Sequence, residues 1–160
     1  VQFIGVDRGP QLEIITEFDS ALPMVWTDPE MVRTIVTNLT LNAIQAMDST
    51  GTLTIRTLSP QGAYRLVRRD RGQMVTIQFQ DTGPGRTKED LGHSFIPFYT
   101  TKSTGSGLGL SICQRVIKSL GGYIEVQSDT GAGCTFSVHF PVRGFLTSDS
   151  IPIIDEPGDD

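Results

Sequence analysis

One row of amides falls in a stretch with helical periodicity. Asn38, Asn42 and Gln45 recur at i, i+4 and i+7, so on a helix they share an edge of the apolar face. A neutral amide oxygen suits a hard cation such as Mg²⁺, which takes oxygen ligands and keeps several waters. An asparagine beside a buried face also needs hydrogen-bond partners. The row therefore fits either a metal site or a polar helix edge.

The turn Asp81–Gly85, with the sequence DTGPG, follows an alternating apolar segment. Its glycines let a ligand approach the backbone, and its aspartate can accept a hydrogen bond from the exocyclic amine of a base. A charge-assisted bond of this kind contributes roughly 1.5–3 kcal/mol. An ordinary Asp/Gly/Pro turn has the same composition, so this pattern alone leaves both interpretations open.

A third pattern, GSGLGL over residues 105–110, opens a second helical stretch. Backbone N–H groups and the positive end of a helix form an anion site that suits phosphates. Gly105, Gly107 and Gly109 alternate, which differs from the dinucleotide-binding fingerprint, and the sequence contains no GxxxxGK[ST] loop. By itself a GxGxG pattern is a weak signal.

Two helices are expected to position these patterns. The first begins at Asp28-Pro29, because aspartate caps a helix and proline at the first helical position loses no hydrogen bond. It runs to about Met47. The second covers Leu108–Leu120 and is stopped by Gly121-Gly122. The apolar stripe of the first helix comprises Val32, Ile35, Val36, Leu39, Ala43 and Ala46.

Strands are expected where β-branched or alternating residues lie between turn signals. Residues 86–107 lack such periodicity, apart from a helical turn near Lys88–Leu91, and a connection of this length is usually functional. The element order predicts an α+β fold, a two-layer α/β sandwich whose mixed sheet has helices on one face and a flexible lid. The predicted strands are Gln11–Phe18, Met24–Thr27, Gly51–Leu58, Met74–Gln80, Tyr123–Ser128 and Cys134–Phe140, the last two as a hairpin.

The composition is that of an ordinary soluble domain. The chain has 160 residues, of which 38% are hydrophobic and 19% charged, and a net charge of −5 without a Lys/Arg run. This balance argues against nucleic acid or an anionic membrane as the main partner. We expect a lead-in over residues 1–10, one domain over 11–142 and an acidic, disordered tail over 143–160. We expect no membrane span or signal peptide, and two packed thiols, Cys113 and Cys134.

Taken in order, these patterns resemble the sequence boxes of the GHKL superfamily, which groups DNA gyrase, a heat-shock chaperone, histidine kinases and MutL. The resemblance covers about residues 11–142. The matching segments are Asn38–Ala46 for the N box, Asp81–Gly85 for the G1 box, Phe95–Tyr99 for the F box, Gly105–Leu110 for the G2 box and Gly131–Phe136 for the last box.

Within that superfamily, the chain most resembles the catalytic ATP-binding domain of a bacterial sensor histidine kinase. Asn38 stands where the gyrase, chaperone and MutL branch has a water-activating glutamate. The absence of this glutamate implies slow hydrolysis of ATP and transfer of phosphate to a protein acceptor. The PFYTTK run at 97–102 resembles the lid of nitrogen-regulation-type kinases, and the GGYIEVQS run at 121–128 also fits.

The resemblance implies ATP and Mg²⁺ as cofactors. Asn42 would hold the Mg²⁺ with Asn38 beside it, Asp81 would bind the adenine amine, and Lys102 would reach the phosphates. Asn38, Asn42 and Lys102 are thus the predicted catalytic residues. The remaining residues implied in nucleotide binding are Gly83, Gly85, Gly105, Gly107, Leu108, Gly109 and Thr135.

Three positions depart from the family pattern. Gln45 replaces a basic residue of many members, Arg86 stands where isoleucine usually follows the G1 box, and Cys134 replaces a common threonine near the adenine pocket. Arg86 is expected at the solvent-exposed surface or in reach of a phosphate. Cysteine forms weaker hydrogen bonds than threonine, which puts one base contact in doubt.

Neither His93 nor His139 has the sequence context of a phosphoacceptor histidine. We expect His93 to be a surface residue of the lid and His139 to be structural, and we expect no autophosphorylation by this chain alone. The implied partners are the dimerisation and phosphoacceptor domain of the same kinase and, through the full protein, a response regulator. The isolated domain should be a cytoplasmic monomer, whether or not the parent is membrane-anchored. Two alternatives remain: a serine kinase of the superfamily, disfavoured by Asn38, and a non-enzymatic nucleotide-sensing module, left open by Gln45 and Cys134.

Overall fold

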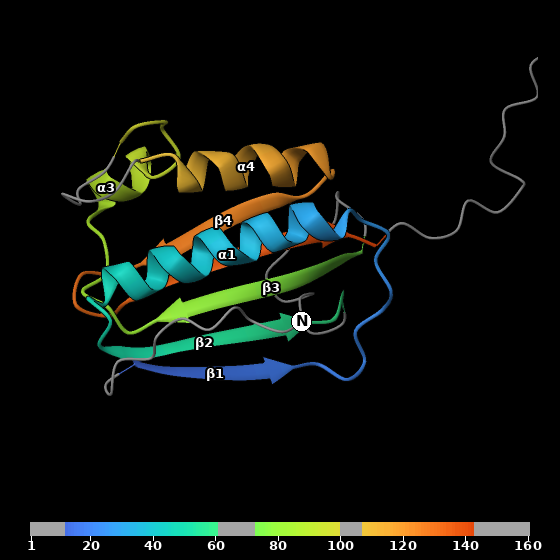
Figure 1. Ribbon diagram of the computed structural model, residues 1–160, viewed down its shortest axis with the longest axis horizontal. Coiled ribbons are helices and arrows are strands. Elements are labelled where there is room, and N and C mark those ends of the chain that lie inside the picture. Colours follow the sequence, from blue (N-terminus) through green and yellow to red (C-terminus); the bar gives the residue numbers. More distant parts are fainter. Residues whose placement is uncertain (1–11, 61–72, 100–106, 143–160) are drawn as a thin grey trace, which may run out of the picture.

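The computed structural model describes residues 12–60, 73–99 and 107–142. The described strands form a mixed five-stranded sheet in the order β1-β2-β3-β5-β4 (Figure 1). β1 and β2 are parallel, and the other neighbours are antiparallel. The strands are β1 (Leu12–Phe18), β2 (Gly51–Leu58), β3 (Met74–Asp81), β4 (Tyr123–Ser128) and β5 (Cys134–Pro141), and the helices are α1 (Pro29–Ala46), α3 (Lys88–His93) and α4 (Gly109–Ser119).

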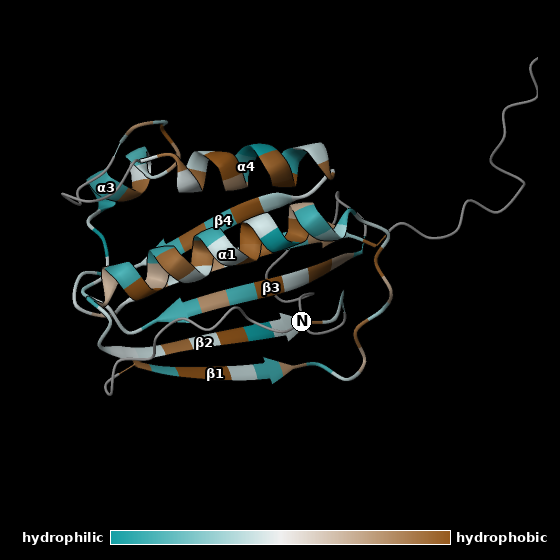
Figure 2. Cartoon of the chain, in the orientation of Figure 1, coloured by the Kyte–Doolittle hydropathy of each residue, from teal (hydrophilic) through white to brown (hydrophobic). Residues whose placement is uncertain are grey.

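Helices α1 and α4 lie side by side on one face of the sheet (Figure 1), which confirms the predicted two-layer α+β sandwich. Both helices carry hydrophobic and hydrophilic segments in alternation along the chain (Figure 2), as expected of helices with one buried face. The core fills the space between the helices and the sheet. Its fully buried members include Ile35, Leu39, Leu53, Phe79, Cys113, Ile117, Phe136 and Val138.

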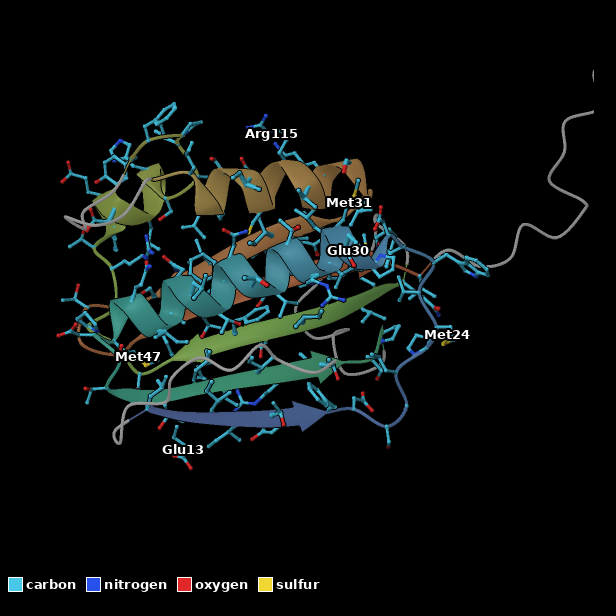
Figure 3. All side chains as sticks on the ribbon, viewed as in Figure 1. Glu13, Met24, Glu30, Met31, Met47 and Arg115 are labelled. Carbon is cyan, nitrogen blue, oxygen red and sulfur yellow. The ribbon has the colours of Figure 1, made fainter. Side chains whose placement is uncertain are left out.

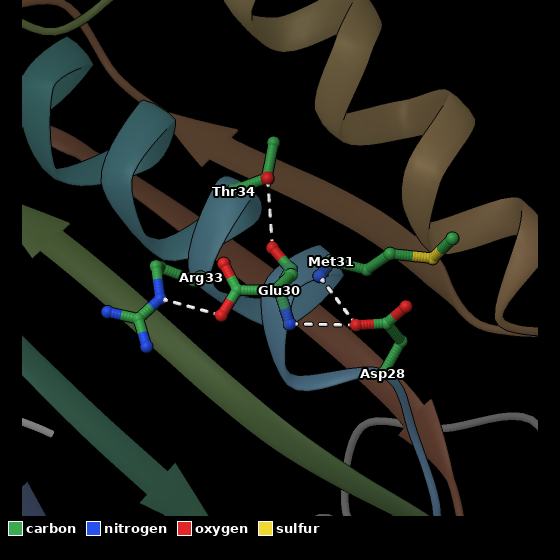
Figure 4. Close-up of polar contacts among 5 residues, drawn as sticks. All are labelled: Asp28, Glu30, Met31, Arg33 and Thr34. Atoms are coloured by element: carbon green, nitrogen blue, oxygen red, sulfur yellow. Dashed lines mark hydrogen bonds and ion pairs between the residues drawn. The ribbon is translucent and has the colours of Figure 1, made fainter.

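The start of α1 follows the capping signal in the sequence (Figure 4). Oδ1 of Asp28 accepts hydrogen bonds from the backbone N–H groups of Glu30 at 2.8 Å and Met31 at 3.4 Å. Pro29 takes the first helical position, where no intrahelical donor is needed. These local contacts fix where the helix begins, and therefore which of its residues face the site.

One predicted strand, Met24–Thr27, is wrong, because this segment is irregular in the structure. Met24 is 89% exposed and Trp26 is 70% exposed, so the large apolar side chains of this segment do not pack against the sheet. Figure 3 shows Met24 beyond the end of the sheet, in the connection from β1 to α1. Pro23 lacks the N–H donor that a strand pairing would use. The apolar residues here reflect a surface connection and not a sixth strand.

The other predicted elements agree with the structure to within a residue or two at each end. The helical turn expected near Lys88–Leu91 is α3, and the last two strands form the expected hairpin. His139, expected to be structural, is 3% exposed on β5, with its Nδ1 at 2.8 Å from Oγ1 of Thr76. The predicted lead-in and tail lie outside the described residues, as does most of the arginine-rich segment 59–73, which the sequence predicts to be an exposed hairpin loop.

Gly133 is expected to tolerate no side chain, because its φ is +81° and an added Cβ would lie 2.0 Å from the carbonyl oxygen of Asp81. Gly131 in the same hairpin turn has a similar φ of +84°, but nothing lies within 4 Å of its added Cβ. We predict that Gly131→Ala costs only the positive-φ strain of about 1–2 kcal/mol. Gly133→Ala should lower the free energy of unfolding, measured in urea, by at least about 2 kcal/mol more. Equal losses for the two variants would contradict the close packing of this turn against β3.

Candidate nucleotide-binding site

Successive turns of α1, which carries the amide row, face the start of α4 and the turn that follows β3. A Cβ built on Gly109, at the start of α4, would lie 3.1 Å from Oδ1 of Asn38. One turn later, Oδ1 of Asn42 accepts a hydrogen bond from the Arg86 guanidinium at 3.4 Å. After another turn, the carbonyl oxygen of Ala46 lies 3.4 Å from a Cβ built on Gly83. Positions 38 to 46 of a helix span about 12 Å, so α1 connects all three patterns into one elongated site.

At one end of this site, Asp81 occupies the last position of β3 and is 3% exposed. Its Oδ1 accepts hydrogen bonds from the backbone N–H of Gly83 at 2.9 Å and of Cys134 at 3.3 Å. These contacts stabilise the ionised carboxylate in a buried position and fix its orientation. An oriented carboxylate at a strand end can accept a hydrogen bond from a ligand amine.

The opposite end of the site is the first turn of α4. Leu108 caps this helix without a side-chain hydrogen bond, in contrast to α1, where Asp28 supplies one. The first N–H groups of a helix lack intrahelical partners and attract anions. The start of α4 therefore presents a phosphate-binding feature directly beside Asn38.

The glycines of the two turns are required by contacts within the protein itself. Gly107 has a φ of +67°, and its added Cβ would lie 2.5 Å from the backbone of Phe98 in the F box. Gly85 has a φ of +72°, and its added Cβ would lie 2.1 Å from the carbonyl oxygen of Asp129. These close approaches hold the G1 turn against the last hairpin and the G2 turn against the F box. The approach of a ligand to the same glycines stays a prediction.

The structure does not bring Thr135 to the other predicted residues. Cys134 pairs with Asp81 in the sheet register, whereas Thr135 pairs with Gln80. Because side chains alternate across a strand, Cys134 shares the helix-covered face with Asp81 and Thr135 lies on the opposite face. The last-box residue beside Asp81 is therefore Cys134, which stands where the resemblance places a common threonine, and a nucleotide contact of Thr135 stays a prediction.

Cys134 is 5% exposed and lies close to two charged groups. Burial, and after it the charge of Asp81, raises the pKa of the Cys134 thiol to about 11, while the nearby Arg86 acts in the opposite direction. The thiol is therefore neutral at physiological pH and is a poor hydrogen-bond former at the base end of the site. Cys113 is fully buried in the core, where desolvation raises its pKa to about 12.

Arg86 lies within the site and not at the fully exposed surface. Its guanidinium donates to Oγ of Ser94 at 3.3 Å and to Oδ1 of Asn42 at 3.4 Å. Its Cζ lies 5.7 Å from the centroid of the Phe136 ring, within cation–π range. A phosphate contact of Arg86 stays a prediction from the sequence. Its contact with Asn42 has no local sequence signal, because the two residues lie far apart in the chain.

Lys102 and Gly105, expected to face the phosphates, lie outside the described residues. Gln45 is exposed, whereas Asn38 and Asn42 are half-buried. His93, expected at the lid surface, is half-buried, with its ring centroid 5.1 Å from that of Tyr99.

The donor set fits a nucleotide more directly than a protein-only metal centre. Within residues 12–60, 73–99 and 107–142, no group of three or more His, Cys, Asp or Glu side chains could hold a metal ion. Asn42 Oδ1 already accepts from a cation, the Arg86 guanidinium, so this oxygen is oriented toward positive charge. One amide oxygen fits a Mg²⁺ whose other ligands are phosphates and water.

The fold and the order of its elements agree with the resemblance to the ATP-binding domains of the GHKL superfamily. A family model described as "Histidine kinase-, DNA gyrase B-, and HSP90-like ATPase" matches residues 27–144. The chain belongs to this family.

Sensor histidine kinases are among the proteins that are similar to this chain. The sensor histidine kinase ZraS of Escherichia coli strain K12 is 36% identical over 144 residues, which cover 89% of this chain and 29% of ZraS. The signal transduction histidine-protein kinase AtoS of the same strain is 33% identical over 143 residues, covering 89% of this chain and 22% of AtoS. The chain thus spans less than a third of the length of these curated relatives.

Solved structures show the same fold. The catalytic domain of histidine kinase ThkA matches with a TM-score of 0.66 and 29% identity, covering 82% of this chain and 79% of that one. Full-length ShkA in complex with AMPPNP matches with a TM-score of 0.65 and 28% identity, covering 81% of this chain and 25% of ShkA. In the part of this chain that the structure describes, no helix has the length and apolar character needed to cross a membrane.

Proposed function

We propose that this chain is the catalytic domain of a sensor histidine kinase, which binds Mg-ATP and transfers the γ-phosphate to a histidine on a separate dimerisation domain. The observation that carries the proposal is the amide at position 38. Asn38 Nδ2 donates to the carbonyl oxygen of Thr34 at 2.8 Å, and its Oδ1 faces the start of α4. No carboxylate stands here to activate water, which favours transfer to a protein acceptor over hydrolysis.

The relatives support the same conclusion. ZraS and AtoS are named histidine kinases, and ShkA was solved with the ATP analogue AMPPNP. By analogy, nucleotide occupies the elongated site along α1, with adenine at Asp81 and the triphosphate beside Asn42 and the start of α4. Gly83 and Gly85 would adjoin the base, and Gly107, Leu108 and Gly109 the phosphates.

Asn42 would hold Mg²⁺ through Oδ1, with Asn38 as a second polar contact. The bound metal would neutralise phosphate charge during in-line transfer. The residues of the chain then act by positioning the nucleotide, with little covalent work. We further propose a nitrogen-regulation-type lid, on the basis of the PFYTTK run, in which Lys102 and Gly105 reach the phosphates.

The partners implied by this function are a dimerisation domain that carries the acceptor histidine and, downstream, a response regulator. Both follow from the kind of kinase to which the relatives belong. We place the reaction in the cytoplasm, where ATP is available.

The experiment that tests this function mixes the purified domain with the histidine-bearing dimerisation domain of its parent kinase and γ-labelled ATP. Label that is lost in acid, resists alkali and requires the acceptor histidine is the expected result. Acid-stable label would indicate a serine kinase. Binding of ATP without any label on the partner would support a nucleotide-sensing module.

A further inference from the structure

Arg86 is held by residues from separate parts of the site. Its backbone N–H donates to Oγ of Ser128 at 2.8 Å, at the end of β4. Its guanidinium contacts Ser94, which is 5% exposed and in turn donates to the carbonyl oxygen of Asp90 at 2.7 Å. The position of the cation is thus determined by packed neighbours and not by a free surface conformation.

The guanidinium contacts residues of both the last strand and α1. On the base side it lies near the Phe136 ring and close enough to Cys134 to oppose the effect of Asp81 on that thiol. On the phosphate side it donates to Oδ1 of Asn42. A permanent positive charge therefore lies beside the amide oxygen that would hold Mg²⁺.

The contacts of the guanidinium are suited to exchange. Its hydrogen bonds to Ser94 and Asn42 are long, at 3.3 and 3.4 Å, and both partners are neutral. Arginine presents five donors in a planar fork, and phosphate oxygens accept from that fork more strongly than neutral oxygens do. A triphosphate beside Asn42 would therefore attract the group that now contacts the amide.

We propose that Arg86 is a resident cation of the nucleotide site that binds the triphosphate next to Asn42 and takes over part of the role of Mg²⁺. This inference rests on the proposed function, because it assigns a ligand to the same site. The guanidinium occupies the oxygen of Asn42 that would hold the metal ion, and the two cations would repel each other. The metal would then add less to nucleotide affinity than it would without the arginine. Nucleoside triphosphates without a metal then remain ligands of this domain.

The test compares ATP affinity in Mg²⁺ with ATP affinity in EDTA, by calorimetry, for the wild type and Arg86→Gln. The quantity measured is the ratio of the dissociation constant in EDTA to that in Mg²⁺. We expect this ratio to be at least tenfold larger in Arg86→Gln, a difference of about 1.4 kcal/mol. Arg115→Gln is the matched control, since Arg115 is exposed on α4 and points away from the body of the domain (Figure 3), and its ratio should equal that of the wild type.

Arg86→Lys keeps the charge but loses the planar fork, so its ratio of dissociation constants should be about threefold larger than that of the wild type. This variant provides the test if Arg86→Gln does not fold. Unchanged ratios in folded Arg86 variants that still bind ATP would overturn the role of Arg86 and leave the proposed function intact. Absence of ATP binding by the folded wild type in Mg²⁺ would overturn the proposed function and this inference with it.

Discussion

Asp81→Asn is expected to weaken ATP binding at least tenfold, about 1.4 kcal/mol, without unfolding the domain. The carboxylate is 3% exposed, and its Oδ1 accepts from the N–H groups of Gly83 and Cys134. An asparagine keeps one oxygen for these two donors. Its amide nitrogen is a donor where the adenine amine requires an acceptor, so the base contact becomes unfavourable.

The measurement is the dissociation constant by calorimetry, with the thermal unfolding midpoint as a check on folding. Asp129→Asn is the matched control, because Asp129 is exposed in the hairpin turn next to the site. Its ATP affinity should stay within about twofold of the wild type. An unchanged dissociation constant in Asp81→Asn would remove Asp81 from the adenine site.

Asn42→Ala is expected to lower the rate of phosphotransfer to the supplied histidine domain by about 100-fold, since removing one preorganised polar group at a reacting centre costs roughly 10²–10³ in rate. Asn42 is the half-buried amide in the middle of α1 whose oxygen faces the site. Alanine has a higher helix propensity than asparagine, so the helix itself should persist.

The initial rate of histidine labelling at saturating Mg-ATP measures this effect. Gln45→Ala on the same helix is the control, because Gln45 is exposed and should leave the rate nearly unchanged. If Asn42→Ala kept a rate within about threefold of the wild type, the metal-binding role of Asn42 would have to be abandoned.

Local signals in the sequence predicted most of the fold. Asp28 and Pro29 fixed the start of α1 because a cap depends on residues only two or three positions away. The alternation of β3 and β5 identified both strands, which the sheet core then confirmed. The short strand predicted at Met24–Thr27 is wrong, because these apolar residues lie in a surface connection where Met24 and Trp26 are exposed.

The site depended more on tertiary contacts. The boxes of the family located Asp81, Asn42 and the start of α4, but the face on which Thr135 points follows from its register with Gln80, which required the structure. The bridge from Arg86 to Asn42 joins residues 44 positions apart. No periodicity or spacing predicts where a long side chain ends, so this contact could only be seen in three dimensions.

We propose that the contacts along α1 form one elongated site on this domain, which binds ATP with adenine at Asp81. The most direct measurement is a pair of calorimetric titrations of the isolated domain in Mg²⁺, one with ATP and one with GTP. The proposed site should show saturable ATP binding in the micromolar-to-millimolar range, at least tenfold tighter than GTP, because GTP has a carbonyl where Asp81 requires an amine. A folded domain that bound neither nucleotide, or bound both equally, would contradict it.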